Sequence, residues 1–463
     1  MTPGWSGTCA KGAQVKPFFF LRASTLLAAL AVAACGAGGS TPVPKAGPLS
    51  FRAAVTPISH VVFIMQENRS FNNLFLNFPG AKTQNYGYDT NGQKIALKPV
   101  DLATDWDIDH FSHGFFAACD GQGKLPGTNC KMDGWNLEQG GFGAPPNFAY
   151  MYVREKQIDP YWKMAKQYVL ADRMFTSNLD GSFISHQYAI SAFARHGVDG
   201  PTTSWGCDGG PGDTVVTLTK DRTYGTPVIV CWDIPSVAGE ADTAGVSWRF
   251  YTGEINGDGG LWSAYQANKS IYYGPDWSSD VINPPAQFLT DVGKGHLANV
   301  TWITPTYAAS DHPGLDAPEG PAWIASVVNA VGTSKFWKST AIFIMWDDWG
   351  GWFDPVKPVY KDYDGLGFRV PLIMISPYAR KGYVTHVQYE TSSVLRYIEN
   401  NFGLTPMAAS DERANDPAGD AFDYTQTPRK FKKFAGGKPT EYWLQTQRNS
   451  RARGIPKSLL GDD

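Results

Sequence analysis

The sequence lacks the short motifs that mark several large enzyme classes. It contains no Gly-x-Ser-x-Gly segment, which argues against a serine esterase built around a nucleophile elbow. It also has no Gly-x-x-x-x-Gly-Lys-Ser/Thr segment, and no Gly-x-Gly-x-x-Gly segment follows a predicted strand. A P-loop nucleotidase and a dinucleotide-binding enzyme are therefore disfavoured. No internal repeat is visible either.

Charge of one sign is also missing. The net charge is −3 and the chain carries no strongly basic cluster, so no electrostatic field steers it toward nucleic acid or an anionic membrane. We therefore expect no nucleic-acid partner.

Cysteine is scarce, with 6 residues in a chain of 463. Setting aside the two in the first 35 residues, four remain: Cys119, Cys130, Cys207 and Cys231. An even number suggests two disulfides if the protein is exported, and we favour nearest-neighbour pairing, Cys119 with Cys130 and Cys207 with Cys231, among the three possible pairings. A zinc site is the alternative, but the paired C-x-x-C spacing is absent.

The first 35 residues resemble an export signal. Basic residues precede an apolar stretch at residues 23–34 that is too short to be a permanent membrane span. The segment Val32–Ala33–Ala34–Cys35 resembles a bacterial lipobox, which would leave a lipid on Cys35; ordinary secretion with cleavage nearby is the alternative. Residues 36–55 indicate a flexible tether. We expect a location in the periplasm, in the cell envelope or outside the cell, with membrane contact only through a lipid anchor.

Apolar runs that alternate with helical patterns predict an α/β fold with a parallel sheet. Strands are expected at residues 60–66, 300–305, 340–346 and 370–377, and helices near residues 155–176, 322–331 and 392–401 with Glu399 in solvent. The main domain should span residues 56–405. Within it, the Gly- and Trp-rich residues from about 200 to 280 suggest an inserted lid, and residues 406–463 suggest a polar C-terminal extension.

Oxygen ligands follow two of the predicted strands. Glu67 and Asn68 come directly after residues 60–66, and Asp347 and Asp348 come directly after residues 340–346. Both runs have the continuous apolar character of strands buried in a parallel sheet, where ligands bind beyond the carboxyl ends. Three carboxylates and an amide oxygen meeting there suit a hard divalent cation. The alternative is that these side chains only solvate a turn or cap a helix.

A hydroxyl and several histidines occupy the predicted loops over the sheet. Ser182 stands at a loop-to-helix junction, where it has three possible roles: helix N-cap, surface residue, or nucleophile at a phosphate-binding helix end. From position alone the cap is favoured. Histidine suits acid–base catalysis near neutral pH, and four of the eight lie in these regions: His110, His113, His186 and His312.

Three motifs resemble a known family. They are the Glu-Asn-Arg-Ser-Phe string at residues 67–71, Lys-Met-Asp-Gly-Trp at 131–135, and Trp-Asp-Asp-Trp-Gly-Gly-Trp-Phe-Asp at 346–354. Between His60 and Leu404 the chain resembles the bacterial phosphoesterase family that contains non-zinc phospholipases C and a group of acid phosphatases, within the alkaline phosphatase superfamily. The resemblance implies an alkaline-phosphatase-like, mostly parallel sheet sandwiched by helices.

The resemblance also implies a site. One divalent metal of the Ca²⁺, Mg²⁺ or Mn²⁺ class would be bound by Glu67, Asn68, Asp347, Asp348 and the nucleophile Ser182. His312, or else His110, would protonate the leaving oxygen, and the reaction would pass through a phosphoseryl intermediate. The nucleophile segment keeps the family's hydroxyl but lacks its two prolines and its asparagine, and Pro355 stands where the family often has histidine.

These features predict a metal-dependent phosphoric ester hydrolase of phospholipase C or acid phosphatase type. The alternatives are a non-catalytic envelope binding protein that keeps the fold, and a sulfatase- or phosphodiesterase-like enzyme on the same core. Ser182 lacks the Pro and Arg context that a sulfatase requires. The substrate, phospholipid or soluble monoester, is left open.

Overall fold

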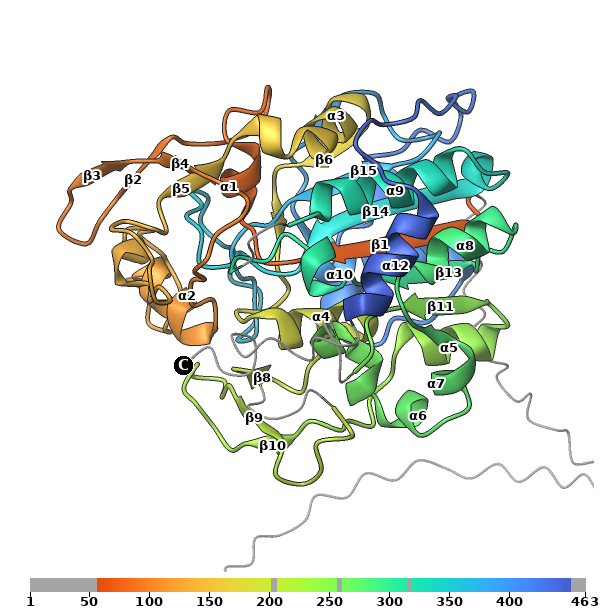
Figure 1. The fold of residues 1–463 in the computed structure, drawn as a ribbon. Coiled ribbons are helices and arrows are strands. Elements are labelled where there is room, and N and C mark those ends of the chain that lie inside the picture. The colour runs from red at the N-terminus through yellow and green to blue at the C-terminus, as the bar shows by residue number, and fades with distance from the viewer. Residues whose placement is uncertain (1–55, 201–205, 256–259, 315–317, 451–463) are drawn as a thin grey trace, which may run out of the picture. The chain divides into compact units, whose positions relative to one another are not determined.

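The computed structural model describes residues 56–200, 206–255, 260–314 and 318–450 (Figure 1). The predicted signal segment with Cys35 and the whole of the predicted tether at residues 36–55 lie outside the described residues. Among the residues described, no helix is both long and apolar enough to cross a membrane.

An eight-stranded sheet forms the centre of the fold, in the order β12-β11-β13-β1-β14-β15-β6-β16. Only β15 runs antiparallel to its neighbours, so the sheet is mostly parallel, as expected for the α/β class. The strand bounds are β1 (His60–Gln66), β6 (Val169–Ala171), β11 (Trp248–Tyr251), β12 (Val281–Ile282), β13 (Val300–Ile303), β14 (Thr340–Trp346), β15 (Leu372–Ile375) and β16 (Tyr383–Thr385).

The two long central strands have the bounds that the sequence predicts. β1 and β14 pair in parallel and in register from His60 opposite Thr340 to Gln66 opposite Trp346. Every residue of β14 is buried, and so is every residue of β1 after His60. Continuous apolar runs produce this pattern because both faces of the strand are covered.

Two layers of helices cover the sheet. Phe343 of β14 packs edge-on against Tyr397 of α10 (Thr391–Phe402). Trp346, three residues along the same strand, packs against Tyr161 of α3 (Asp159–Gln167). Because alternate strand residues point to opposite faces, α3 and α10 lie on opposite faces. The first layer consists of α3 (Asp159–Gln167), α8 (Gln287–Gly293), α9 (Gly320–Gly332) and α12 (Thr440–Ser450); the second contains α4 (Ser182–Ser191), α5 (Val237–Ala244), α10 (Thr391–Phe402) and α11 (Ala409–Arg413).

Smaller elements surround this core. They are α1 (Phe71–Phe75), α2 (Ser112–Cys119), α6 (Lys269–Tyr272), α7 (Asp276–Ser279), the strand pairs β2 (Tyr86–Tyr88) with β3 (Lys94–Ala96), β4 (Lys98–Val100) with β5 (Met151–Val153), and β7 (Met174–Phe175) with β17 (Tyr389–Glu390), and the sheet of β8 (Gly197–Val198), β9 (Thr214–Thr217) and β10 (Val228–Ile229). Both predicted disulfides are present, Cys119–Cys130 and Cys207–Cys231.

Three sequence predictions need correction. The helix expected near residues 155–176 is only α3, and β6 and β7 follow it, because a short apolar run can form either a buried strand or a buried helix. The predicted lid at residues 200–280 contributes β11 to the central sheet. That part of the segment therefore belongs to the core and is not an inserted lid. In the predicted polar extension, Phe422, Phe434 and Trp443 are buried in the main core.

Candidate active site

The carboxyl ends of β1 and β14 carry the acidic residues of the site. Gln66 and Trp346 are the last residues of the two strands and lie opposite each other, so Glu67 and Asp347 leave the sheet side by side. The backbone N–H of Asn68 donates to Oδ1 of Asp347 over 2.9 Å. Asn68 has a positive φ of 55°, a conformation that costs energy in a non-glycine residue and is concentrated at functional sites.

The two glycines after Asp348 leave room for this arrangement. Gly350 has φ +58°, and a Cβ there would lie 2.1 Å from the carbonyl oxygen of Asn68. Its backbone N–H donates to Oδ1 of Asp348 over 2.7 Å, which fixes that carboxylate. A side chain at position 350 would therefore push apart the two loops that carry the candidate ligands.

Ser182 is the first residue of α4, and Gly181 occupies the N-cap position. The predicted N-cap role of Ser182 is therefore wrong. Its Oγ lies 3.4 Å from Oδ1 of Asn68 and 3.5 Å from Oδ2 of Asp348. The ring of His110 packs close to Gly181, and its Cδ2 would be 3.1 Å from a Cβ at position 181. The hydroxyl thus faces the ends of both long strands.

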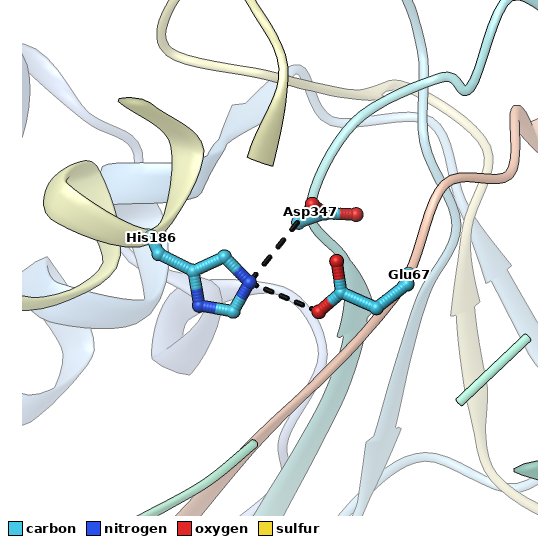
Figure 2. Close-up of side chains that lie close together, drawn as sticks. All are labelled: Glu67, His186 and Asp347. Atoms are coloured by element: carbon cyan, nitrogen blue, oxygen red, sulfur yellow. Dashed lines mark hydrogen bonds and ion pairs between the residues drawn. The ribbon is translucent and has the colours of Figure 1, made fainter. Parts of the chain in front are cut away.

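His186 reaches the same point from one turn further along α4. Its Nε2 lies 3.0 Å from Oε1 of Glu67 and 3.9 Å from Oδ2 of Asp347 (Figure 2). One donor atom from each of the three residues falls within 4.8 Å of the others. Sequence reasoning noted His186 as a loop-region histidine but did not assign it to the site; its spacing of four from Ser182 on a predicted helix was the available signal.

Buried negative charge dominates the electrostatics. Burial, and then the charges of Asp347 and Asp348, raise the pKa of Glu67 well above its ordinary value. Burial and the charge of Asp347 raise the pKa of Asp348 in the same way. Oε2 of Glu67 and Oδ2 of Asp347 have no hydrogen-bond partner among the described residues.

A divalent cation would compensate this buried negative charge and bind the carboxylate oxygens. The site offers carboxylate, amide and hydroxyl oxygens together with an imidazole nitrogen, and a cation would neutralise several buried carboxylates at once. The residues present therefore fit the metal that the sequence predicts.

His110 lies against Asn68. Its Nδ1 is 2.7 Å from the carbonyl oxygen of Ile108, so Nδ1 carries the proton. Its Nε2, which then accepts, is 2.7 Å from Nδ2 of Asn68. The contact turns the amide oxygen of Asn68 toward Ser182.

His312 lies beside this group on the loop after β13. Its Nδ1 is 2.7 Å from the carbonyl oxygen of Pro313 and 3.8 Å from Oδ2 of Asp107. Its ring stacks on Trp262 and lies 6.2 Å from the ring of His110, centroid to centroid. Burial lowers the pKa of His312. His113 does not join the cluster around Ser182. It is half exposed, and its Nε2 lies 2.5 Å from Oδ2 of Asp109.

Two buried arginines hold the loops of the site, and sequence reasoning assigned neither a role. Nε of Arg69 donates to the carbonyl oxygen of Asp311 over 2.8 Å, which ties the loop after β1 to the loop that carries His312. Nη2 of Arg369 lies 3.0 Å from Oδ2 of Asp354, and both side chains are fully buried. For Arg369 the available signal was a charged residue between the apolar Phe368 and Val370, and for Arg69 it was the position within the Glu-Asn-Arg-Ser-Phe motif.

A cavity of about 260 Å³ opens beside His113. Its wall includes Asp107 and Asp109, together with the turn at residues 139–141. The backbone N–H of Gly141 donates to the carbonyl oxygen of Asp107 over 2.9 Å, so the turn is fixed to the site loop. Phe142, the next residue, is fully exposed, and Leu137 is half exposed.

Known proteins share this sequence pattern. The model of the phosphoesterase family matches residues 58–405. Phospholipase C B of Mycobacterium tuberculosis is 26% identical over 421 residues, which cover 76% of this chain and 74% of that protein. Hemolytic phospholipase C of Pseudomonas aeruginosa is 26% identical over 491 residues, covering 88% of this chain and 63% of that protein. A Vibrio parahaemolyticus structure from the alkaline phosphatase superfamily is 9% identical with a TM-score of 0.36, over 78% of this chain and 72% of that one.

Proposed function

The chain belongs to the phosphoesterase family and is a hydrolase of phosphoric esters, and we propose that it acts through Ser182 beside one divalent metal ion. The observation that carries the proposal is the position of the Ser182 hydroxyl, between Asn68 and Asp348 at the first residue of α4. Free backbone N–H groups and the helix dipole at such an end favour a phosphate group.

The ligand set of the proposal is Glu67, Asn68, Asp347, Asp348 and Ser182. When bound, the metal supplies positive charge that favours the serine alkoxide and balances charge on the phosphoryl oxygens. His110 keeps the amide oxygen of Asn68 directed at this point. The buried surroundings exclude water from the charges, which strengthens each of these interactions.

Ser182 Oγ attacks phosphorus, the bond from phosphorus to the leaving oxygen breaks, and a phosphoseryl group forms. Nε2 of His312 takes the proton that Ser182 Oγ loses and gives it to the leaving oxygen; Nε2 can accept that proton because Nδ1 already donates to Pro313. The same imidazole then takes a proton from the water that attacks phosphorus and gives it to Oγ of Ser182 as the bond from phosphorus to Oγ breaks, which releases phosphate and restores the hydroxyl.

Replacement of the nucleophile tests this scheme. Ser182→Ala should reduce hydrolysis of a chromogenic phosphate ester by several orders of magnitude, while circular dichroism and the melting temperature stay close to those of the unaltered protein. Retention of near-normal turnover would remove Ser182 from its role.

A non-catalytic binding protein with the same fold is the competing function. An assay of a chromogenic phosphate ester with and without a chelator separates the two. Hydrolysis that chelator abolishes and added metal restores supports the enzyme, whereas binding of the ester without turnover supports the alternative.

We favour a phospholipid as the substrate. The alternative is a soluble phosphate monoester, the type of substrate that an acid phosphatase hydrolyses. The relatives reported above are named phospholipases C. In addition, the exposed apolar side chains Leu137 and Phe142 flank the turn that lines the cavity beside Asp107, whose Oδ2 lies 3.8 Å from Nδ1 of His312. Exposed apolar side chains at the mouth of a site suit contact with a lipid surface.

We also propose that the protein is exported and held at the cell envelope by a lipid on Cys35. The support is the sequence of residues 1–35 alone. A Cys35→Ser variant should move from the membrane fraction to the soluble fraction of the producing cells, and an unchanged distribution would favour ordinary secretion.

A further inference from the structure

We propose that His186 is itself a metal ligand and that its nitrogen makes the site select a transition metal ion such as Zn²⁺, Co²⁺ or Fe²⁺ over Ca²⁺ and Mg²⁺. The inference rests on the proposed metal-dependent function and goes beyond the all-oxygen ligand set that the sequence predicts.

The helix places the imidazole at the site. Ser182 and His186 are four residues apart on α4, so their side chains lie on the same face of the helix. Figure 2 shows the imidazole edge pointing between Glu67 and Asp347, which come from β1 and β14. Its Nε2 is 3.0 Å from Oε1 of Glu67 and 3.9 Å from Oδ2 of Asp347. His186 is almost completely buried, so this nitrogen faces the carboxylates and not solvent.

If His186 only donated a hydrogen bond to Glu67, the carboxylates of Glu67 and Asp347 would be left incompletely paired. A neutral imidazole has at most one N–H at Nε2, and that proton satisfies one oxygen of one carboxylate. Oε2 of Glu67 and Oδ2 of Asp347 then have no hydrogen-bond partner among the described residues. A cation held between the three side chains would contact the nitrogen and both carboxylates.

The donor atoms determine the metal preference. Carboxylate and amide oxygens alone suit Ca²⁺, Mg²⁺ and Mn²⁺, whereas imidazole suits zinc, iron, copper and nickel. Carboxylate oxygen is also a normal zinc ligand, so a mixed set of one nitrogen and several oxygens binds Zn²⁺ well. Ca²⁺ would gain little from His186.

A His186→Gln variant distinguishes a ligand from a hydrogen-bond partner. Glutamine keeps a side-chain N–H that can donate to Glu67, but it offers an oxygen to a metal and not a basic nitrogen. If His186 only positions Glu67, the Gln variant should retain the metal preference of the unaltered protein. His113→Gln is the matched control, because that histidine is half exposed and pairs with Asp109 away from the cluster.

The experiment is competitive calorimetric titration of the metal-free full chain with Zn²⁺, Co²⁺, Mg²⁺ and Ca²⁺. We expect the unaltered protein and His113→Gln to bind Zn²⁺ and Co²⁺ far more tightly than Mg²⁺. We expect His186→Gln to lose at least about 10–100-fold in affinity for Zn²⁺ and Co²⁺, the range known for supporting groups of metal sites. Its affinity for Mg²⁺ should change much less.

A second readout needs no variant. Pulsed electron paramagnetic resonance of Mn²⁺ bound to the unaltered protein should show the ¹⁴N modulation of a directly bound imidazole. Absence of that modulation, or equal Zn²⁺ affinity in the unaltered protein and His186→Gln, overturns the proposal. Ester hydrolysis that still depends on Mg²⁺ or Ca²⁺ in that case would leave the proposed function intact. A protein that binds none of these ions overturns both.

Discussion

The Nε2 atom of His110 lies 2.7 Å from the side-chain nitrogen of Asn68, and this hydrogen bond decides which end of the amide faces Ser182. The direction follows from the other ring nitrogen, which donates to the carbonyl oxygen of Ile108. His110 therefore acts on the site through Asn68, whereas His312 is placed to exchange protons with a substrate.

Loss of the His110 ring should weaken the site without removing any ligand. We expect His110→Ala to lower kcat/KM for a chromogenic phosphate ester by about 10–100-fold, the usual cost of losing a group that orients a ligand. Metal affinity measured by calorimetry should fall with it. His386→Ala is the control and should leave both quantities unchanged, because that histidine is largely exposed and pairs with Asp172 outside the site. If both variants behave alike, the orienting role assigned to His110 is wrong.

The buried pair of Arg369 and Asp354 should be important for stability. Arg369 also donates to the carbonyl oxygens of Lys82 and Asp172, so its guanidinium joins three segments. Arg369→Met leaves the Asp354 carboxylate buried without its partner, and we expect a loss of about 3–5 kcal/mol in the free energy of unfolding.

Urea denaturation of this variant measures that loss. Lys163→Met provides the comparison, since it breaks only the surface ion pair with Asp159 and should cost about 0–1 kcal/mol. Similar losses for the two variants would contradict the structural importance of the Arg369 pair.

Glu399 should make the protein less stable as the solution becomes alkaline. The sequence suggested that this side chain lies in solvent, but it is buried in α10. Burial, and then a hydrogen bond with Asp411 and the charge of that residue, raise its pKa from 4.5 to about 9. Because the unfolded chain releases this proton at lower pH than the folded chain does, the free energy of unfolding should fall as the pH rises from 4.5 to about 9.

Glu399→Gln stays neutral at every pH and should flatten this part of the stability profile. Melting temperatures recorded across that pH range measure the effect. Glu412→Gln, at an exposed position of α11, should reproduce the pH profile of the unaltered protein. A Glu399→Gln profile as steep as that of the unaltered protein would show that the buried carboxyl is not the cause.

The exposed ring of Phe142 should matter for lipid surfaces only. We expect Phe142→Ser to reduce hydrolysis of phospholipid in vesicles about tenfold or more, since a phenyl group buried in lipid contributes about 1.5–3 kcal/mol. Turnover of a soluble phosphate ester should be unchanged. Ile229→Ser removes an exposed apolar side chain from β10 and serves as the control. Equal loss on both substrates would indicate damage to the site and not a lipid contact.

Long local patterns were predictable from the sequence. The continuous apolar runs of β1 and β14 predicted their bounds, and the residues that follow them predicted that Glu67, Asn68, Asp347 and Asp348 would meet. Short elements were not predictable in the same way. β11 has four residues and β6 has three, and their place in the sheet depends on pairing with distant strands.

The roles of individual side chains depended on contacts between distant segments. For Ser182, position alone favoured a helix cap, whereas in the structure Gly181 occupies the cap position. His186 looked like one histidine among several, and Glu399 looked like a surface acid, because burial is not encoded in the neighbouring residues alone.

The sequence by itself determined the class of fold and which acidic residues end the central strands, because these follow from periodicity, composition and motif, whereas it left three disulfide pairings possible. Tertiary structure decided which side chains join those acids. Parallel, in-register pairing of β1 with β14 puts Glu67 next to Asp347, and the packing of α4 over the same edge brings Ser182 and His186 to them. Such convergence depends on the directions of three segments far apart in the chain, and no local pattern specifies those directions.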